Sequence, residues 1–276
     1  MINFNGSILS KDEVKLTYNN RAFKYGDSIF ETIKIKNGRV IFWEDHYFRL
    51  MASMRMLRMK IPLEFTLEFL EQEILKTFQS NKITGTCRAR MSVYRKDGGL
   101  YKPNTNNIDY LIEVKEVANK PKEQFRVDLY KDFYVYSGHL STIKSNNKLV
   151  NTLAAIYAEE NDLDNCILLN ERKGVVGVTN GNIFLIKDRV IKTPPITEGC
   201  LKGIVREKII EIISKSSEYE IEEIPLTPFE IQKSDEVFFT NSIVGVQAIT
   251  HYRKKEFKTE ISKKLIANLK VIEMTS

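Results

Sequence analysis

The chain lacks the features that mark membrane, secreted or metal-binding proteins. Its only cysteines, Cys87, Cys166 and Cys200, lie far apart without a paired metal-ligand spacing, so we expect free thiols in a reducing compartment. No apolar run is long enough to cross a bilayer. The first residues contain neither the basic segment nor the apolar core of a signal peptide. These absences predict a cytoplasmic protein without a membrane segment.

A concentrated basic block is also missing, although the formal net charge is +6 and the pI is near 9.0. Lysine and glutamate are intermingled along most of the chain, so the charge mildly favours anionic ligands and predicts no nucleic-acid partner. There is no solenoid repeat and no low-complexity tract. The 276 residues are 42% hydrophobic, which is enough to build one large domain or two ordinary ones.

Residues 1–117 are predicted to form a small N-terminal α+β domain. Residues 32–36 alternate between apolar and polar, and Asn37-Gly38 tolerates the positive φ angles of a type I′ turn, which together predict a hairpin continuing into residues 39–42. Periodicity predicts the other elements of this domain: a helix from about Glu44, a helix at 66–79 behind a Thr66 cap, and strands at 87–94 and 110–117.

Residues 118–124 have the solvating and chain-breaking composition of a linker. Residues 125–276 are then predicted to form a larger C-terminal α/β domain. Its predicted strands are 125–136, 166–170, 182–187 with a hairpin through 187–188, 222–225, 236–239 and 246–252, and its predicted helices are 147–160, 202–215, a short one after Pro228, and a terminal one containing Ile261 and Ile272.

Lys144 is the first candidate for chemistry. A catalytic lysine needs an amine that is easily made neutral, and burial promotes this by disfavouring the ammonium form. Lys144 follows apolar Ile143 and precedes a predicted helix rich in small and apolar residues. The same residue can also be read as an ordinary surface lysine near a helix start.

Three other places suit an anionic ligand. Gly203 precedes a predicted helix whose first amides would point towards negative charge. Thr240-Asn241-Ser242 follows the apolar strand 236–239, at the kind of edge where α/β proteins bind ligands. Arg49 could give a bidentate charge to a phosphate. The alternatives are a glycine that permits close helix packing, a polar turn, and an arginine that extends to solvent over apolar surface.

An ordered set of motifs resembles the class IV (fold type IV) pyridoxal-phosphate enzymes, the family of branched-chain aminotransferases, D-amino-acid aminotransferases and 4-amino-4-deoxychorismate lyases. These motifs are residues 21–32, 44–50, 143–147, 182–185, 193–204 and 236–242. Each is modest alone, but together they occur in the family order over nearly the whole chain. The resemblance implies a two-domain fold with the cofactor, pyridoxal 5'-phosphate, held between the domains.

The resemblance also assigns roles to individual residues. It implies that Lys144 forms a Schiff base with the cofactor and later moves the α-proton of the substrate. Arg49, the backbone at Ile204 and Val205, and the hydroxyl of Thr240 would bind the cofactor phosphate. Val205 stands where most members have threonine, which removes one hydroxyl donor while the backbone donors remain.

Substrate contacts are implied for Phe30, Arg95, Asn241 and Ser242. Arg95 matches a position that helps to bind the substrate carboxylate in some members. The residues after it, 96–101, would form an active-site loop.

Gly177 is the main departure from the family pattern. Family members have a glutamate here, whose carboxylate keeps the pyridine nitrogen of the cofactor protonated. Glycine supplies no such group, and a lost charge-assisted hydrogen bond is worth roughly 1.5–3 kcal/mol. If the missing carboxylate limits the rate, Gly177→Glu would raise turnover.

The function implied by the resemblance is that of a homodimeric aminotransferase. It would transfer the amino group of a small, branched-chain-like amino acid to a 2-oxo acid such as 2-oxoglutarate. The first alternative is 4-amino-4-deoxychorismate lyase, which releases pyruvate and 4-aminobenzoate. The second is a cofactor-binding relative with weakened catalysis, because of Gly177.

Overall fold

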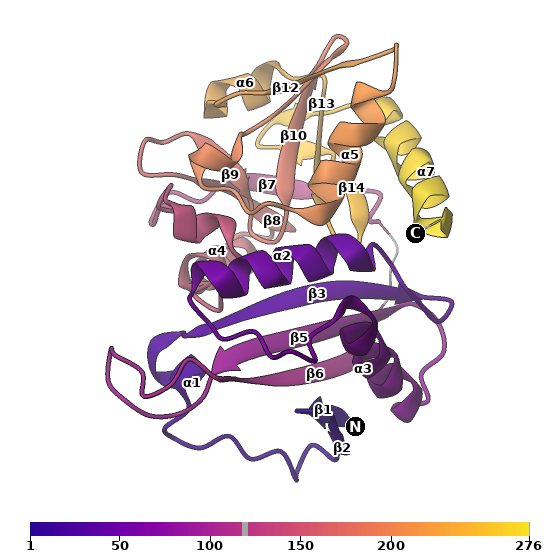
Figure 1. Cartoon of the computed structure of the whole chain (residues 1–276). Coiled ribbons are helices and arrows are strands. Elements are labelled where there is room, and N and C mark those ends of the chain that lie inside the picture. Colours follow the sequence, from indigo (N-terminus) through magenta and orange to yellow (C-terminus); the bar gives the residue numbers. More distant parts are fainter. Residues whose placement is uncertain (118–120, 276) are drawn as a thin grey trace. The chain divides into compact units, whose positions relative to one another are not determined.

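The computed structural model of the chain describes residues 1–117 and 121–275 (Figure 1). The predicted linker, 118–124, begins with three residues that lie outside this description. The described residues divide into two compact units. Unit 1 contains residues 1–117 together with Lys144–Asn147, and unit 2 contains residues 121–143 and 148–275. The mixture of sheets and helices confirms the predicted α/β fold class.

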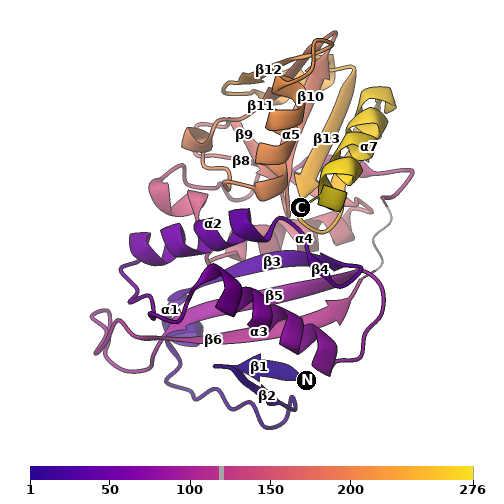
Figure 2. The same cartoon turned by 45° about the vertical axis from the view of Figure 1, so that its right-hand side comes forward.

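Unit 1 is built on one antiparallel sheet with the strand order β2-β1-β6-β5-β3-β4. Its strands are β1 (Ile2–Phe4), β2 (Ser7–Leu9), β3 (Ser28–Lys36), β4 (Arg39–Val40), β5 (Cys87–Arg95) and β6 (Ile108–Glu116), and its helices are α1 (Arg21–Tyr25), α2 (Trp43–Met56) and α3 (Leu67–Ser80). Helices α2 and α3 contact each other and pack on the sheet, as Figures 1 and 2 show.

The two long helices of unit 1 follow the predicted pattern. Thr66 caps α3 by accepting a hydrogen bond from the Phe69 amide at 3.2 Å, which confirms the predicted cap. Leu70 and Ile74 of α3 are fully buried, as the apolar spacing requires. Helix α2 buries Leu50 and Met54 in the same way, and it also buries His46.

The predicted hairpin of unit 1 is confirmed, but its second strand ends at Val40 instead of continuing to residue 42. Asn37 and Gly38 have φ angles of 52° and 73°, the left-handed values that a type I′ turn needs. Lys36 pairs with Arg39 across the turn, so β3 and β4 form the predicted two-residue hairpin. This register places Ile33 and Ile35 on the buried face of β3, the face that also carries Glu31.

Unit 2 contains two five-stranded sheets, with the orders β12-β11-β10-β13-β14 and β16-β15-β7-β8-β9. The strands are β7 (Arg126–Leu129), β8 (Asn165–Leu169), β9 (Val175–Val178), β10 (Asn182–Lys187), β11 (Val190–Thr193), β12 (Glu220–Glu223), β13 (Glu236–Asn241), β14 (Gly245–Ile249), β15 (His251–Tyr252) and β16 (Lys255–Glu256). The helices are η1 (His139–Thr142), α4 (Leu149–Glu160), η2 (Ile196–Glu198), α5 (Ile204–Ser214), α6 (Pro228–Lys233) and α7 (Glu260–Thr275).

The two sheets of unit 2 share one hydrophobic core. Alternate residues of β10 and β13, including Ile183 and Phe239, meet residues of the other sheet, including Val127 and Ile167. On the outer face of β10 and β13, Phe184 stacks on Phe238 with a centroid distance of 4.7 Å. Helices α5 and α7 contact each other and pack on this sheet (Figures 1 and 2).

Two strand predictions in unit 2 were wrong in their extent. The predicted strand 125–136 ends at Leu129, because Tyr130 turns into the small core beside α4 and the charged residues after it are exposed. The predicted strand 246–252 is divided between the two sheets. Thr250 separates the halves, and its hydroxyl accepts a hydrogen bond from the Phe125 amide at 2.8 Å. Strand β9 was not predicted.

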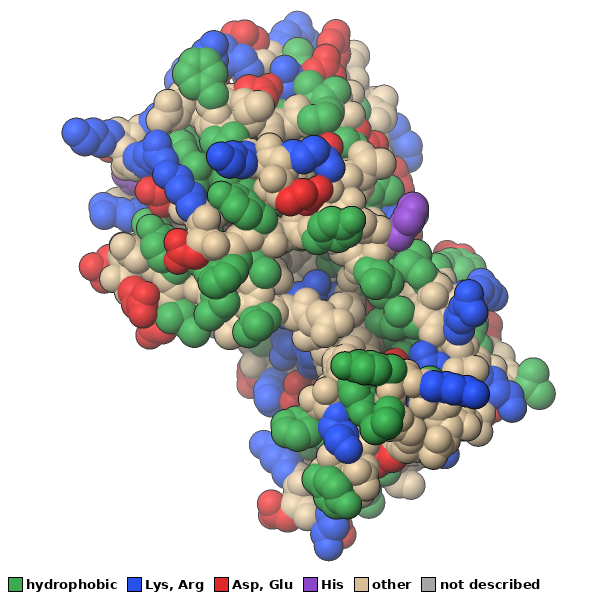
Figure 3. Space-filling model, turned by 90° about the vertical axis from the view of Figure 1, so that its left-hand side faces the viewer, with side chains coloured by type: hydrophobic (Ala, Val, Ile, Leu, Met, Phe, Trp, Pro, Cys, Tyr) green, Lys and Arg blue, Asp and Glu red, His purple; other side chains and the backbone are tan. Residues whose placement is uncertain are grey.

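The surface charge is dispersed, as the intermingled sequence predicts. Figure 3 shows lysine and arginine side chains among aspartate and glutamate side chains on the face that it draws. Within the described residues, no helix is both long enough and apolar enough to cross a membrane.

Candidate active site

Lys144 lies in a short segment, Lys144–Asn147, that is hydrogen-bonded to the start of β3. The Lys144 carbonyl accepts a hydrogen bond from the Phe30 amide at 2.8 Å, and the Asn146 amide donates to the Ser28 carbonyl at 3.0 Å. Ile29 and Ser145 form an isolated antiparallel bridge between these bonds. The segment is therefore an added edge of unit 1, and its backbone holds Lys144 in a defined place.

The side chains around Lys144 form a group centred on an aromatic ring. The Nζ atom of Lys144 lies 4.7 Å from the centroid of the Phe30 ring, and the guanidinium of Arg90 lies 3.6 Å from the same centroid. Arg90 also donates a hydrogen bond from Nη2 to Oδ1 of Asn146 at 3.0 Å. Burial lowers the pKa of Arg90 from its ordinary value, so this cation is partly desolvated. An amine and an arginine on one ring can serve a substrate that carries a carboxylate.

Arg49 belongs to a buried ionic group on the helix-covered side of the sheet. Its Nε and Nη2 atoms donate to the two carboxylate oxygens of Glu31 at 2.8 and 2.5 Å, and Nδ1 of His46 lies 2.8 Å from the same carboxylate. Burial opposes ionisation of Glu31, but the charge of Arg49 and the hydrogen bonds from His46 and Arg49 bring the pKa down to about 2.

His46 in this group is held neutral. Burial lowers its pKa, and the charges of Arg49 and Lys144 act in the same direction against the opposing effect of Glu31. Since an ionised carboxylate only accepts hydrogen bonds, Nδ1 of His46 must carry the proton of the neutral ring. His46 therefore donates a hydrogen bond to Glu31. Glu31 in turn fixes the orientation of the Arg49 guanidinium by accepting from its Nε and Nη2 atoms.

Arg95 is fixed by internal partners. Its Nε donates to Asp27 at 2.9 Å, Nη1 donates to Asn106, and Nη2 donates to the Leu57 carbonyl at 2.7 Å. Asp27 also pairs with Arg21 at 2.9 Å. A substrate carboxylate would have to replace one of these bonds, so the geometry favours Arg90 over Arg95 for that contact.

Helix α5 in unit 2 begins without a side-chain cap. Its N-cap is Gly203, which is followed by the first-turn amides of Ile204 and Val205. Uncapped first-turn amides and the helix dipole attract an anion. A Cβ atom at position 203 would collide with Oδ1 of Asn182, so a larger residue there would require the Asn182 side chain to move. Asn182 in turn donates to the Leu201 carbonyl at 2.9 Å, which fixes the approach to the helix.

Thr240 supplies a second, independent sign of a ligand. It pairs with Asn182 across β13 and β10, is 1% exposed, and its hydroxyl has no hydrogen-bond partner within the part of the chain that the structure describes. An unpartnered buried hydroxyl is unfavourable unless a ligand satisfies it. The glycine-bounded start of α5 and the hydroxyl of Thr240 thus fit a phosphate group.

Asn241 and Ser242 lie just beyond Thr240 and are partly buried. Oδ1 of Asn241 accepts hydrogen bonds from the amides of Ile243 and Val244 at 3.0 and 2.9 Å. This contact fixes the turn that follows β13. Asn241 therefore shapes the edge of the strand, and its side-chain oxygen is already engaged.

Gly177 occupies the middle of β9, opposite Leu168 of β8. A Cβ atom on Gly177 would lie 2.7 Å from the carbonyl oxygen of Gly181, a backbone atom. The glycine is therefore part of the local backbone packing, which changes the expectation for Gly177→Glu. Restoring the family carboxylate at this position requires the turn at 178–181 to move.

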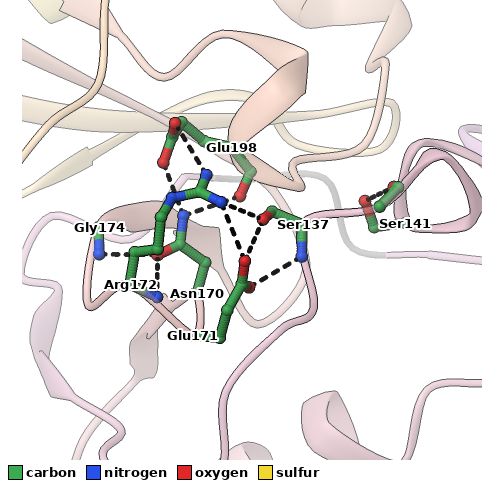
Figure 4. Close-up of polar contacts among 8 residues, drawn as sticks. Ser137, Ser141, Asn170, Glu171, Arg172, Gly174 and Glu198 are labelled. Atoms are coloured by element: carbon green, nitrogen blue, oxygen red, sulfur yellow. Dashed lines mark hydrogen bonds and ion pairs between the residues drawn. The ribbon is translucent and has the colours of Figure 1, made fainter.

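A polar network in unit 2 holds two loops that lead to site residues (Figure 4). Arg172 donates to Ser137 at 2.8 Å and to Glu198 at 3.1 Å, while the Ser137 amide donates to Glu171 at 2.9 Å. Buried Asn170 donates to Glu198 at 2.6 Å. Ser137 precedes η1 and Lys144 in the chain, and Glu198 precedes the start of α5.

Three residues near the site were not recognised from the sequence as contributors: Glu31, His46 and Arg90. Arg90 alternates with buried Ala89 and Met91 in β5, a pattern that predicts an outward side chain but not its stacking on Phe30. His46 lies at helical spacing with Leu50, which predicts burial. Only the pairing of β3 with α2 reveals its carboxylate partner.

Comparison with known proteins gives a consistent result. The model of the family described as Amino-transferase class IV matches residues 28–252. A Methanocaldococcus jannaschii protein provisionally named a branched-chain-amino-acid aminotransferase is 29% identical over 99% of this chain and 92% of its own length. The aminodeoxychorismate lyase of Vibrio harveyi is 24% identical over 87% of this chain and 88% of its own length.

Among solved structures, the branched-chain aminotransferase of the thermophilic archaeon Thermoproteus uzoniensis, solved with norvaline, is similar over 99% of this chain and 94% of that one. The TM-score is 0.89 and the identity is 23%, so this likeness supports the fold. The family model extends from β3, which bears Phe30 and Glu31, to the end of β15. The chain therefore belongs to the class IV aminotransferase family of pyridoxal-phosphate-dependent enzymes.

Proposed function

We propose that this protein is an aminotransferase that uses pyridoxal 5'-phosphate to move the amino group of a small, branched-chain-like amino acid to a 2-oxo acid. The observation that carries the proposal is the arrangement of Lys144 and Arg90 on the ring of Phe30, at 4.7 and 3.6 Å from its centroid. An amino acid and its oxo acid both carry the carboxylate that an arginine recognises. The relative from Methanocaldococcus jannaschii supports the branched-chain choice.

The residues of the chain fit the cofactor. Lys144 is the amine that holds it covalently and that moves the α-proton of the substrate. The amides of Ile204 and Val205 and the hydroxyl of Thr240 bind its phosphate, supported by the uncapped helix and the unpartnered hydroxyl. When bound, the cofactor supplies the electron-accepting ring that transamination needs.

Arg49 is proposed to add a fixed positive charge to the phosphate. Glu31 holds its guanidinium through Nε and Nη2, and the buried group leaves little rotational freedom. A preorganised arginine loses less entropy when it binds a phosphate than a free one does. Neutral His46 supports this orientation without adding a second charge.

The substrate contacts are proposed as follows. Arg90 binds the carboxylate, Phe30 packs beside Lys144, and Asn241 and Ser242 border the strand end near Thr240. Arg95 retains its predicted contribution only if Asp27 or Asn106 gives way to the ligand. The resemblance also proposes a homodimer, which light scattering on the purified protein would test.

The experiment begins with absorbance of the cofactor-saturated protein. We expect a band near the visible edge that Lys144→Ala abolishes, and its absence from the wild-type protein would contradict the proposal. Single half-reactions should then convert the bound cofactor with branched-chain amino acids faster than with D-alanine. Production of the matching oxo acid, measured by mass spectrometry, identifies the substrate class.

The second candidate is 4-amino-4-deoxychorismate lyase, which the likeness to the Vibrio harveyi enzyme favours. Arg90 would bind a carboxylate of that substrate as well. Release of pyruvate from aminodeoxychorismate, coupled to lactate dehydrogenase, distinguishes the two functions. A rate above that of the amino-acid half-reactions would replace the first proposal with this one.

A further inference from the structure

The turn between β9 and β10 is built from closely packed backbone. A Cβ atom on Gly177 would lie 2.7 Å from the Gly181 carbonyl oxygen, and a Cβ atom on Gly181 would lie 2.6 Å from the Thr240 carbonyl oxygen. Real Cβ atoms essentially never come this close to a backbone oxygen. The backbones at Gly177, Gly181 and Thr240 therefore approach one another too closely for side chains at either glycine.

Hydrogen bonds fix this turn in place. The Val178 amide donates to the Gly181 carbonyl at 2.9 Å, and the Gly181 amide donates back to the Val178 carbonyl at 3.3 Å. The Thr179 amide donates to the Cys166 carbonyl at 3.0 Å and to Oδ1 of Asn165 at 3.1 Å. Moving the Gly181 carbonyl away from position 177 would break bonds on both sides of the turn.

Two acidic residues in the neighbouring loops and strands are engaged and distant. Glu198 accepts from Asn170 and Arg172 beside Gly174 (Figure 4), and Gly174 is three residues from Gly177, or about 10 Å at strand spacing. Glu236 accepts the first amides of α7 and lies four residues from Thr240 in β13, or about 13 Å. Neither carboxylate replaces the missing one without rearrangement.

We infer that the turn at 177–181, whose residues carry no carboxylate, leaves the pyridine nitrogen of the cofactor without an anionic partner, so that this nitrogen stays unprotonated in this enzyme. The inference rests on the proposed function. A neutral carbonyl stabilises a pyridinium far less than a carboxylate does, because it carries no full charge. The consequence is a weaker electron sink, so removal of the α-proton in the proposed amino transfer should be slower than with a carboxylate at this position.

The first test uses the full chain loaded with cofactor labelled with ¹⁵N in the ring. We expect the nitrogen resonance at about pH 8 to match the unprotonated form of the free cofactor, and a resonance of the protonated form would overturn the inference. The Lys144-dependent absorbance band is measured on the same sample. Loss of that band contradicts the proposed function instead, so the two failures are distinguishable.

The second test compares Gly177→Ala and Gly177→Glu, which add the same Cβ atom with and without a carboxylate. We expect both variants to melt at a lower temperature than the wild type and to bind the cofactor more weakly. Gly138→Ala is the control, because its Cβ atom would meet only the exposed, movable ring of Tyr136. A Gly177→Glu protein with wild-type stability and a protonated ring nitrogen would overturn the claim that backbone fills this position.

Discussion

The candidate site residues of unit 1 and unit 2 contribute different kinds of chemical group. In unit 1, the groups proposed to bind the ligand are side chains: Lys144 and Arg90 lie on Phe30, and Glu31 binds Arg49 in a buried ion pair. In unit 2, the groups proposed to lie against the cofactor are mostly backbone: the start of α5 and the turn at 177–181. The groups in unit 1 therefore depend on the charge of their side chains, whereas those in unit 2 depend on glycines, which have no Cβ atom.

Glu31→Gln should have the largest effect on stability, because it removes a buried charge that pairs with Arg49. Breaking such a pair costs about 3–5 kcal/mol. The matched control is Glu113→Gln, since Glu113 lies 3.9 Å from Arg88 and both are partly exposed. That change should cost roughly 0–1 kcal/mol. Urea unfolding measures both values, and equal losses would contradict the contrast between buried and exposed charge.

Lowering the pH should also reveal how much the buried Glu31–Arg49 pair stabilises unit 1. The pKa of Glu31 is lowered from 4.5 to about 2, so its contribution to stability is complete above pH 4.5 and is lost as the pH falls from 4.5 towards 2. His46, whose pKa burial lowers from 6.5, adds a loss of the same sign below pH 6.5. Unfolding curves from about pH 7 to about pH 3 should show this decline, and Glu31→Gln should flatten its lower part.

Arg90→Gln should weaken substrate binding more than it weakens folding. Loss of a charge-assisted hydrogen bond costs roughly 1.5–3 kcal/mol, which corresponds to roughly 10- to 150-fold in KM for the amino acid. Arg88→Gln, two residues away on the same strand, is the control and should leave KM nearly unchanged. The cofactor band should persist in both variants. Equal KM changes would show that Arg90 acts only through general charge.

Thr240→Val should have the smallest effect of these substitutions. It should stabilise the protein without cofactor but weaken the binding of the cofactor. Without cofactor, removing a buried, unpartnered hydroxyl should raise stability by about 1 kcal/mol. With cofactor, affinity should fall about 10-fold, because a hydrogen bond to the phosphate is lost. Thr240→Ser keeps the hydroxyl and should retain most of the affinity. Titration calorimetry measures the affinity for the cofactor, and thermal unfolding measures the stability of the cofactor-free protein.

The sequence predicts the site of unit 1 only in part. Lys144 and Arg49 can be named as chemically capable residues, because their charge and motifs are visible in the chain. Arg90 cannot be chosen over Arg95 from the sequence, since both lie in one strand. The contacts in the structure distinguish the two arginines. Arg95 forms an ion pair with Asp27, while Arg90 stacks on Phe30 and donates a hydrogen bond to Asn146.

Unit 2 shows a different limit. The motif around Thr240 and the glycine before α5 can be recognised in the sequence, and the fold class follows from the alternation of predicted strands and helices. The sequence also identifies Gly177 as a departure from the family pattern, but it does not show what surrounds this glycine. Only the three-dimensional structure shows that the Gly181 carbonyl lies close enough to exclude a side chain there. Backbone packing between residues that pair across strands leaves no trace in residue type alone.

The most direct test of the account is to trap the bond between Lys144 and the cofactor. The cofactor-saturated protein is reduced with sodium borohydride, digested, and mapped by mass spectrometry. We expect one modified peptide, which contains Lys144 and carries the mass of the reduced cofactor. An unmodified Lys144 peptide, or equal labelling of several lysines, would contradict the assignment of this chain as a pyridoxal-phosphate enzyme acting through Lys144.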